Sequence, residues 1–152
     1  MYYLKLAAKL LQKESPEIEK VAGEEGYYYA LCTGEREAFE SIYDEKDDPM
    51  NVLAAIECSA ESPKKRKVLE TISIFDYVEE EDFAVLLNRY VLCKLENKCL
   101  SEDEKQQICE WIDNRKCEFG YSTYGGGYDF RTSAYYANIL YVLDGGEDVG
   151  LR

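Results

Sequence analysis

Two kinds of helical segment alternate along this chain, and this alternation is the sequence feature that most constrains its fold. The segments 83–95 and 134–143 are apolar on nearly all sides, whereas the segments 64–77 and 102–116 carry a single apolar stripe each. A helix that is apolar all round must be covered on most sides, and a one-striped helix is suited to covering it. The pattern predicts an all-α fold of antiparallel α/α helical hairpins in two layers, with the apolar helices inside.

Capping residues indicate where the helices begin. Each of the three prolines follows a Ser or Asp, as in Ser62-Pro63, and proline suits the first position of a helix that such a residue caps. Ser101 and Glu104 have the spacing of a capping box, and Asp129 is placed to cap the last helix. The alternation of residues over 72–78 leaves a short strand there as an alternative. We predict helices over 49–60, 64–77, 81–96, 102–116 and 131–143, with shorter ones over 2–13, 16–31 and 35–43.

Charge and residue inventory exclude several functions. The chain has 152 residues, and 18 Lys and Arg against 31 Asp and Glu give it a net charge of −13, which repels nucleic acid and anionic membranes. It has no histidine, so it cannot form a Ser-His or Cys-His catalytic pair or a His-ligated metal site. No segment approaches the roughly 20 apolar residues of a membrane span. We expect a cytoplasmic protein with one repeat domain over 1–152, without cofactor, metal, nucleic acid or membrane span.

Six cysteines are present, and no two of them have the spacing of a zinc knuckle or a redox dithiol. Most lie among apolar neighbours, where a free cysteine behaves as a small buried hydrophobic residue. We therefore expect free thiols, with disulfides as the alternative. The cysteines are Cys32, Cys58, Cys93, Cys99, Cys109 and Cys117.

The segment leading into the last helix holds the densest aromatic cluster, gathered around Gly125, Gly126 and Gly127. A tyrosine ring is apolar with a polar tip, so such a cluster suits a pocket for an extended apolar ligand or a protein-recognition surface. The alternative is that the rings close the end of the helical stack and the glycines allow the chain to turn. The candidate ligand-binding residues are Phe119, Tyr121, Tyr124, Tyr128, Phe130, Tyr135 and Tyr136.

A basic block, Lys64, Lys65, Arg66 and Lys67, opens the helix after Pro63. Positive charge in a first helical turn opposes the helix macrodipole, so a compensating interaction is expected. The block is a candidate anion site, for example for a diphosphate. The alternatives are a nuclear-import-like signal, plain solvation, or ion pairing with the acidic residues at 79–82, with Glu61 or across a subunit contact.

The order of residues over 102–143 resembles the repeat of protein prenyltransferase β subunits and of squalene or terpene cyclases. That repeat has an outer helix ending in Trp-Ile, a Gly-aromatic loop, an acidic residue, then Thr and small or aromatic residues opening an inner helix. The resemblance implies an α/α toroid of about six hairpins with about 40 to 50 residues each, so this chain would supply half a toroid. The matching residues are Trp111, Ile112, Phe119, Gly120, Tyr121, Asp129, Thr132, Tyr135, Tyr136, Ala137 and Leu140.

The departures from the family pattern determine the expected function. Prenyltransferases hold zinc with Asp, Cys and His, and polyene-protonating cyclases use an Asp-rich motif; this chain lacks histidine and that motif. No catalytic residue is therefore carried over, and we expect a noncatalytic interaction or assembly module. An open arc exposes apolar helix surface, which predicts a homodimer or a second toroid-half protein as partner. The alternatives are a binding protein for an apolar isoprenoid-like ligand, and an enzyme of this type that uses Tyr128 or Asp129 as an acid.

Overall fold

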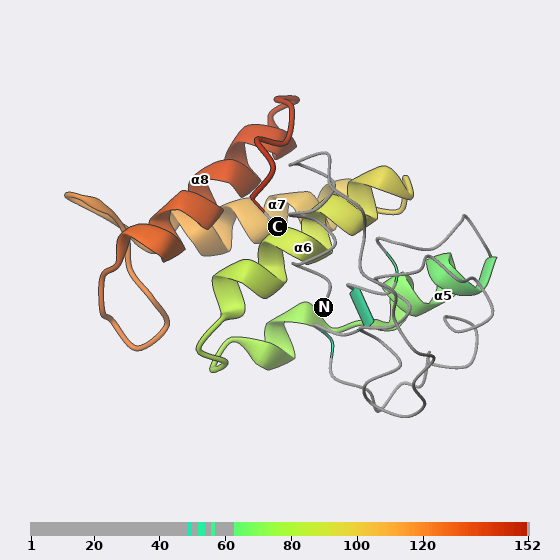
Figure 1. Cartoon of the computed structure of the whole chain (residues 1–152), viewed down its shortest axis with the longest axis horizontal. Coiled ribbons are helices and arrows are strands. Elements are labelled where there is room, and N and C mark those ends of the chain that lie inside the picture. The colour runs from blue at the N-terminus through green and yellow to red at the C-terminus, as the bar shows by residue number, and fades with distance from the viewer. Residues whose placement is uncertain (1–48, 50–51, 54–55, 57–62, 152) are drawn as a thin grey trace, which may run out of the picture. The chain divides into compact units, whose positions relative to one another are not determined.

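The computed structural model describes residues 49, 52–53, 56 and 63–151 (Figure 1). The chain divides into two units, Met1–Val68 and Leu69–Arg152. The helices predicted over 2–13, 16–31 and 35–43 lie outside the described residues, as do Cys32 and Cys58. Of the helix predicted over 49–60, the described residues are all helical, and Val52, Leu53 and Ile56 are buried. The single domain over 1–152 stays a prediction.

Helix α5 (Pro63–Thr71) begins at the proline that the sequence marked as its first residue. It ends six residues earlier than the predicted Tyr77, because Ile72 and its neighbours interrupt the helix and the chain forms a separate 3-10 turn, η1 (Ile74–Tyr77). β-Branched residues at the junction restrict side-chain rotamers and disfavour a continuous helix. The alternative of a strand over 72–78 is therefore wrong.

Helix α6 (Phe83–Glu96) forms the centre of the second unit. Almost all of its side chains are buried, with Leu87, Val91 and Cys93 fully so, which confirms that this helix is covered on most sides. Two of its polar side chains are also buried and have partners: Asn88 accepts a hydrogen bond from Asn138 at 2.9 Å, and Lys94 forms an ion pair with a carboxylate.

Helix α7 (Glu102–Asp113) runs antiparallel to α6. The start of α6 contacts the end of α7 through Phe83 and Trp111, and the end of α6 contacts the start of α7 through Lys94 and Glu104. The predicted capping box is confirmed, because Ser101 and Glu104 each satisfy the other's backbone N–H. One stripe of α7 is buried, as expected for a covering helix, and the helix ends at Asp113 rather than at residue 116.

Helix α8 (Phe130–Leu143) begins at the predicted cap, where the Thr132 N–H donates to Asp129 Oδ1 at 2.7 Å. It lies beside α6 and runs in the same direction, since Arg131 pairs with Asp82 and Asn138 pairs with Asn88 (Figure 1). The prediction that α8 is covered on most sides is wrong. Within the described part of the chain α6, α7 and the preceding hairpin contact one face, and the opposite face is exposed.

Between α7 and α8 the chain forms a small antiparallel hairpin from β1 (Lys116–Cys117) and β2 (Gly120–Tyr121). The described chain is therefore dominated by helices but is not purely helical. Ser133 of α8 fixes the hairpin, because its Oγ accepts the Tyr121 N–H at 3.0 Å. Gly120 has a φ of +142°, and a Cβ there would lie 2.5 Å from that oxygen. No helix among the described residues is long and apolar enough to cross a membrane.

Candidate interaction surface and the neighbouring cavity

The predicted aromatic cluster does not line one pocket, because Tyr136 belongs to the core and the half-buried Tyr121 packs against it. Tyr136 is 2% exposed, and its ring packs edge-on against Trp111 at 5.6 Å and against Tyr121 at 6.0 Å. Trp111 in turn packs against Phe83 at 5.1 Å. Burial raises the pKa of Tyr136 to about 12, so its hydroxyl stays protonated at neutral pH. Tyr121 and Tyr136 hold the hairpin and α8 against α7.

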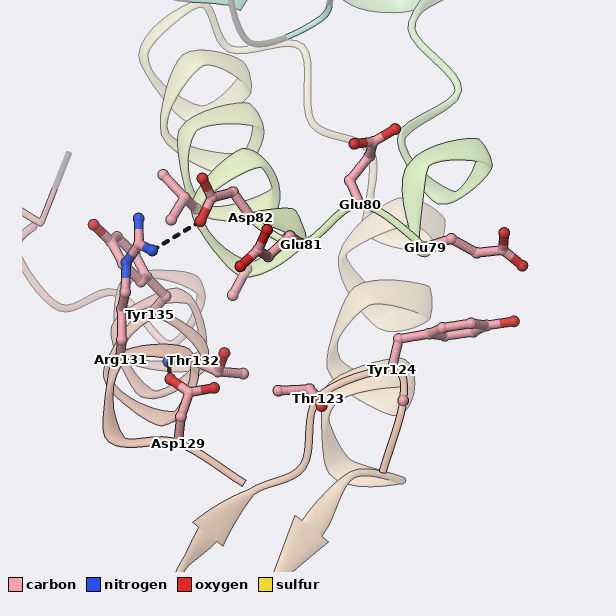
Figure 2. A pocket seen from close by; sticks show the side chains of 13 residues that line it. Glu79, Glu80, Glu81, Asp82, Thr123, Tyr124, Asp129, Arg131, Thr132 and Tyr135 are labelled. Atoms are coloured by element: carbon pink, nitrogen blue, oxygen red, sulfur yellow. Dashed lines mark hydrogen bonds and ion pairs between the residues drawn. The ribbon is translucent and has the colours of Figure 1, made fainter. Parts of the chain in front are cut away.

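Two other members, Tyr124 and Tyr135, line a cavity of about 480 Å³. Figure 2 shows this cavity between the acidic turn that precedes α6, the loop after β2 and the first turn of α8. Arg131 also lines it and pairs with Asp82 at 2.8 Å. The carboxylates that line the cavity are Glu79, Glu80, Glu81, Asp82 and Asp129.

The charge of this cavity is strongly negative. Hydrogen bonds from the backbone N–H and the hydroxyl of Thr132 lower the pKa of Asp129, so this carboxylate is ionised at neutral pH. Arg131 is the one cation among the described residues that line the cavity, and its pairing with Asp82 offsets only one of the five carboxylates. An anionic ligand such as a diphosphate would therefore be repelled from this cavity.

The remaining members, Phe119, Tyr128 and Phe130, lie on the outer surface and are 73%, 41% and 82% exposed. The Tyr128 and Phe130 rings contact each other edge-on at 5.5 Å, and the Tyr128 hydroxyl donates a hydrogen bond to the Phe119 carbonyl. These contacts hold the Tyr128 ring beside Phe130 at the N-terminus of α8 and tie Tyr128 to the backbone of Phe119. They leave the ring faces of Phe119 and Phe130 in solvent.

The exposed face of α8 continues this aromatic surface along the helix. We call Phe130, Ala134, Ala137 and Tyr141 the α8 stripe; all four are exposed, and Tyr141 is 55% exposed. Sequence reasoning missed the last three because it treated α8 as a covered helix. The signal that could have found them is their spacing, which places them on one helical face opposite the buried Ile139.

The surface formed by the loop and the α8 stripe carries little charge. In a chain that is 32% charged, Asp129 and Arg131 are the only charged residues between Phe119 and Leu143. Both are already engaged within the chain, because Asp129 caps α8 and Arg131 pairs with Asp82. The surface therefore presents mainly aromatic and small side chains, with Asp129 and Arg131 as its two charged residues.

The basic block lies on α5 in the unit Met1–Val68, whereas the aromatic residues lie in the unit Leu69–Arg152. Lys65 is buried at 6% exposure, while Arg66 and Lys67 are exposed. The side chain of Lys64 lies outside the described residues. An anion site at this block stays a prediction.

A polar cluster joins α6 to α7. Glu104 Oε1 accepts from Lys94 Nζ at 2.6 Å and from the Tyr90 hydroxyl at 2.8 Å. Tyr90 and Glu104 also line a small cavity of about 220 Å³. Burial, and next the hydrogen bond to Glu104, raises the pKa of Tyr90 far above its usual value, so its hydroxyl does not act as a base. These contacts hold α6 and α7 together.

None of the described cysteines, Cys93, Cys99, Cys109 and Cys117, forms a disulfide. Cys93 is fully buried in α6, as expected for a small hydrophobic residue, whereas Cys117 in β1 is exposed. Among the described residues no three Cys, Asp or Glu side chains are grouped closely enough to hold a metal ion.

Comparison of the chain with protein-family models, with curated proteins and with solved structures found no match. The resemblance to prenyltransferase and cyclase repeats therefore stays a prediction from the residues themselves.

Proposed function

We propose that this chain is a noncatalytic, prenyltransferase-like helical-repeat module that assembles with a second copy of itself. The observation that carries the proposal is the aromatic surface on an otherwise highly charged chain, with Phe119, Phe130 and Tyr141 more than half exposed. At about 200 Å² per ring, the exposed fractions of these rings and of Tyr128 amount to roughly 500 Å². The largest apolar patch on a typical monomer covers about 300 to 600 Å² and often has a function.

The directions of the helices are compatible with a repeat of hairpins. Antiparallel hairpins that follow one another place every second helix in the same direction, and α6 and α8 run in the same direction with α7 antiparallel to α6. This order supports the half-toroid as the architecture of the module. It also supports an assembly role, since an arc has helix surface left to cover.

The titratable groups give little support for catalysis. The buried tyrosines, Tyr90 and Tyr136, have raised pKa values and stay protonated. Glu104 is saturated by hydrogen bonds from three residues. The acidic lining of the larger cavity disfavours the diphosphate of an isoprenoid substrate, and so favours an interaction module over an isoprenoid-binding protein.

Light scattering coupled to size-exclusion chromatography tests the proposal. Over loading concentrations from about 1 to about 100 μM, we expect the mass to rise from the 17.5 kDa of one chain toward twice that value. A mass of one chain at every concentration would overturn the proposal. A control run in reducing buffer must give the same curve, because the exposed Cys117 could otherwise link chains covalently.

A further inference from the structure

We propose that two copies pair through the α8 stripe, with their α8 helices antiparallel and related by a two-fold axis. This inference rests on the proposed self-association and adds the contact surface and its register. It follows from three properties of the stripe: its symmetry, its lack of charge and its size.

The stripe is symmetric about its centre. Phe130, Ala134, Ala137 and Tyr141 are spaced by four, three and four residues, which keeps them on one helical face. A two-fold axis midway between Ala134 and Ala137 would place Phe130 against the partner's Tyr141 and Ala134 against the partner's Ala137. A two-fold interface needs a patch that is complementary to itself, and an order of large, small, small, large side chains provides one.

The small residues at the centre allow a close approach of the two helices. Interaxial distances of roughly 8 to 10 Å depend on the side chains at the crossing, and alanine gives the lower end. At each end of the contact two aromatic rings would then meet, in the tilted or edge-on geometry that aromatic pairs prefer. The ring of Tyr141 is already positioned by the chain after α8, because a Cβ at Gly146 would lie 2.5 Å from it.

The lack of charge on the α8 stripe favours a second copy of the chain as its binding partner. Two copies with a net charge of −13 each repel one another, so a contact between them costs least where neither presents acidic side chains. None of the four residues of the α8 stripe is acidic, and the exposed Asp144 lies just beyond its end. A basic partner would instead gain from the carboxylates around the larger cavity, where Glu79, Glu80 and Glu81 are exposed.

The size of the surface is adequate for a reversible dimer. A standard interface buries about 800 Å² on each partner. At about 200 Å² per side chain, the exposed fractions of Phe130 and Tyr141 supply roughly 270 Å² of this area, and the alanines with the neighbouring side chains of α8 supply more. Tyr128 contacts the Phe130 ring and bonds to the Phe119 carbonyl, and with these two loop residues the exposed area reaches roughly 500 Å².

Complementary charge variants test both the surface and its register. A134E and A137K each place one charge at the centre of the proposed contact, and we expect each to raise the dimer dissociation constant by about 100-fold or more in sedimentation velocity. An equimolar mixture of the two variants should recover a heterodimer, because the carboxylate introduced in one chain then faces the ammonium introduced in the other. The control variants Q107E and Q107K place the same charges on an exposed position of α7 and should dimerise like the unchanged chain.

Circular dichroism and the fluorescence of Trp111 establish that each variant is folded. If the unchanged chain dimerises and A134E dimerises equally well, the α8 contact is wrong while the proposed self-association stands. If the single variants are monomeric and their mixture is also monomeric, the antiparallel register is wrong. If the unchanged chain is itself monomeric, both proposals fail.

Salt dependence separates this contact from ionic pairing between copies. An uncharged contact between two anionic chains should tighten as salt screens their repulsion, so the dissociation constant should fall between about 50 and 500 mM salt. Pairing of the basic block of one copy with the acidic cavity of the other would show the opposite trend. Weakening by salt would therefore overturn the α8 contact.

Discussion

Replacing Glu104 with glutamine removes the charge at the junction of α6 and α7. Lys94 is 3% exposed and its ammonium lies 2.6 Å from Glu104 Oε1, so the substitution leaves a buried cation without its counterion. The Tyr90 hydroxyl and the capping box at Ser101 also bond to this carboxylate. E104Q therefore perturbs three contacts without changing the volume of the side chain.

The expected loss of stability follows from the burial of Lys94. Breaking a buried ion pair by removing one partner costs about 3 to 5 kcal/mol. Glutamine still offers a carbonyl acceptor and the Glu104 side chain is 32% exposed, so we expect about 2 to 3 kcal/mol. For a chain of this size that lowers Tm by roughly 5 to 10 °C. The control E102Q changes an exposed residue in the same helical turn and should cost less than about 1 kcal/mol.

The stability lost in E104Q should also depend on pH, and it should decrease at acidic pH. Burial alone would raise the pKa of Glu104, but the hydrogen bonds from Lys94, Ser101 and Tyr90 outweigh it and hold this pKa below its ordinary value of 4.5. A folded-state pKa below the unfolded one means that the ionised carboxylate stabilises the fold above about pH 4.5. That contribution is lost as the pH falls through the folded-state pKa. The difference in the free energy of unfolding between the unchanged chain and E104Q should therefore be largest at pH 7 and shrink below pH 4.5.

Urea unfolding followed by tryptophan fluorescence measures this difference. The chain has one tryptophan, and Trp111 packs against Phe83 and Tyr136, so its emission reports the packing of α7 on α6 and α8. Equal losses for E104Q and E102Q at pH 7 would refute the account of this junction. A loss for E104Q that persists unchanged at acidic pH would refute the assigned cause.

Three further predictions concern the hairpin, the cap and the cavity. G120A should destabilise the fold by about 1 to 3 kcal/mol, since its Cβ would lie 2.5 Å from Ser133 Oγ at a positive φ, whereas G125A meets no atom within 4 Å and should leave the urea midpoint unchanged. D129A should cost about 1 kcal/mol through loss of the α8 cap, with D144A at the other end of α8 as the neutral control; equal midpoints would contradict the cap. Prenyl diphosphates should give no thermal shift at neutral pH, because the larger cavity is lined by carboxylates; a saturable rise in Tm would count against the interaction module.

The helix starts could be predicted from the sequence because capping is a local property. Pro63, the pair Ser101 and Glu104, and Asp129 each act within one turn of the helix that they begin. The burial of α6 was also predictable, since a helix with almost no polar surface has few alternatives. The early end of α5 could not be predicted from the sequence. The signal from the β-branched residues is weak compared with the apolar stripe that continues through this segment.

The site could not be predicted to the same extent, because it depends on which elements pack together. The aromatic residues are close in sequence, yet Tyr136 enters the core, Tyr124 lines the cavity and Phe130 lies in solvent. The cavity brings Asp82 and Asp129 together only through the packing of α6 beside α8. The free face of α8 likewise follows from where its neighbours lie. Local patterns do not contain that information.

Hydroxyl-radical footprinting at increasing protein concentration tests the central claim most directly, since it reports which side chains are covered on association. Phe130 and Tyr141 are 82% and 55% exposed in a single chain, and we predict that their oxidation slows several-fold as the dimer forms. Tyr124, which is 53% exposed and lines the cavity instead, should be oxidised at an unchanged rate. Oxidation of Phe130 and Tyr141 that is independent of concentration, in a sample whose mass shows dimers, would contradict assembly through α8.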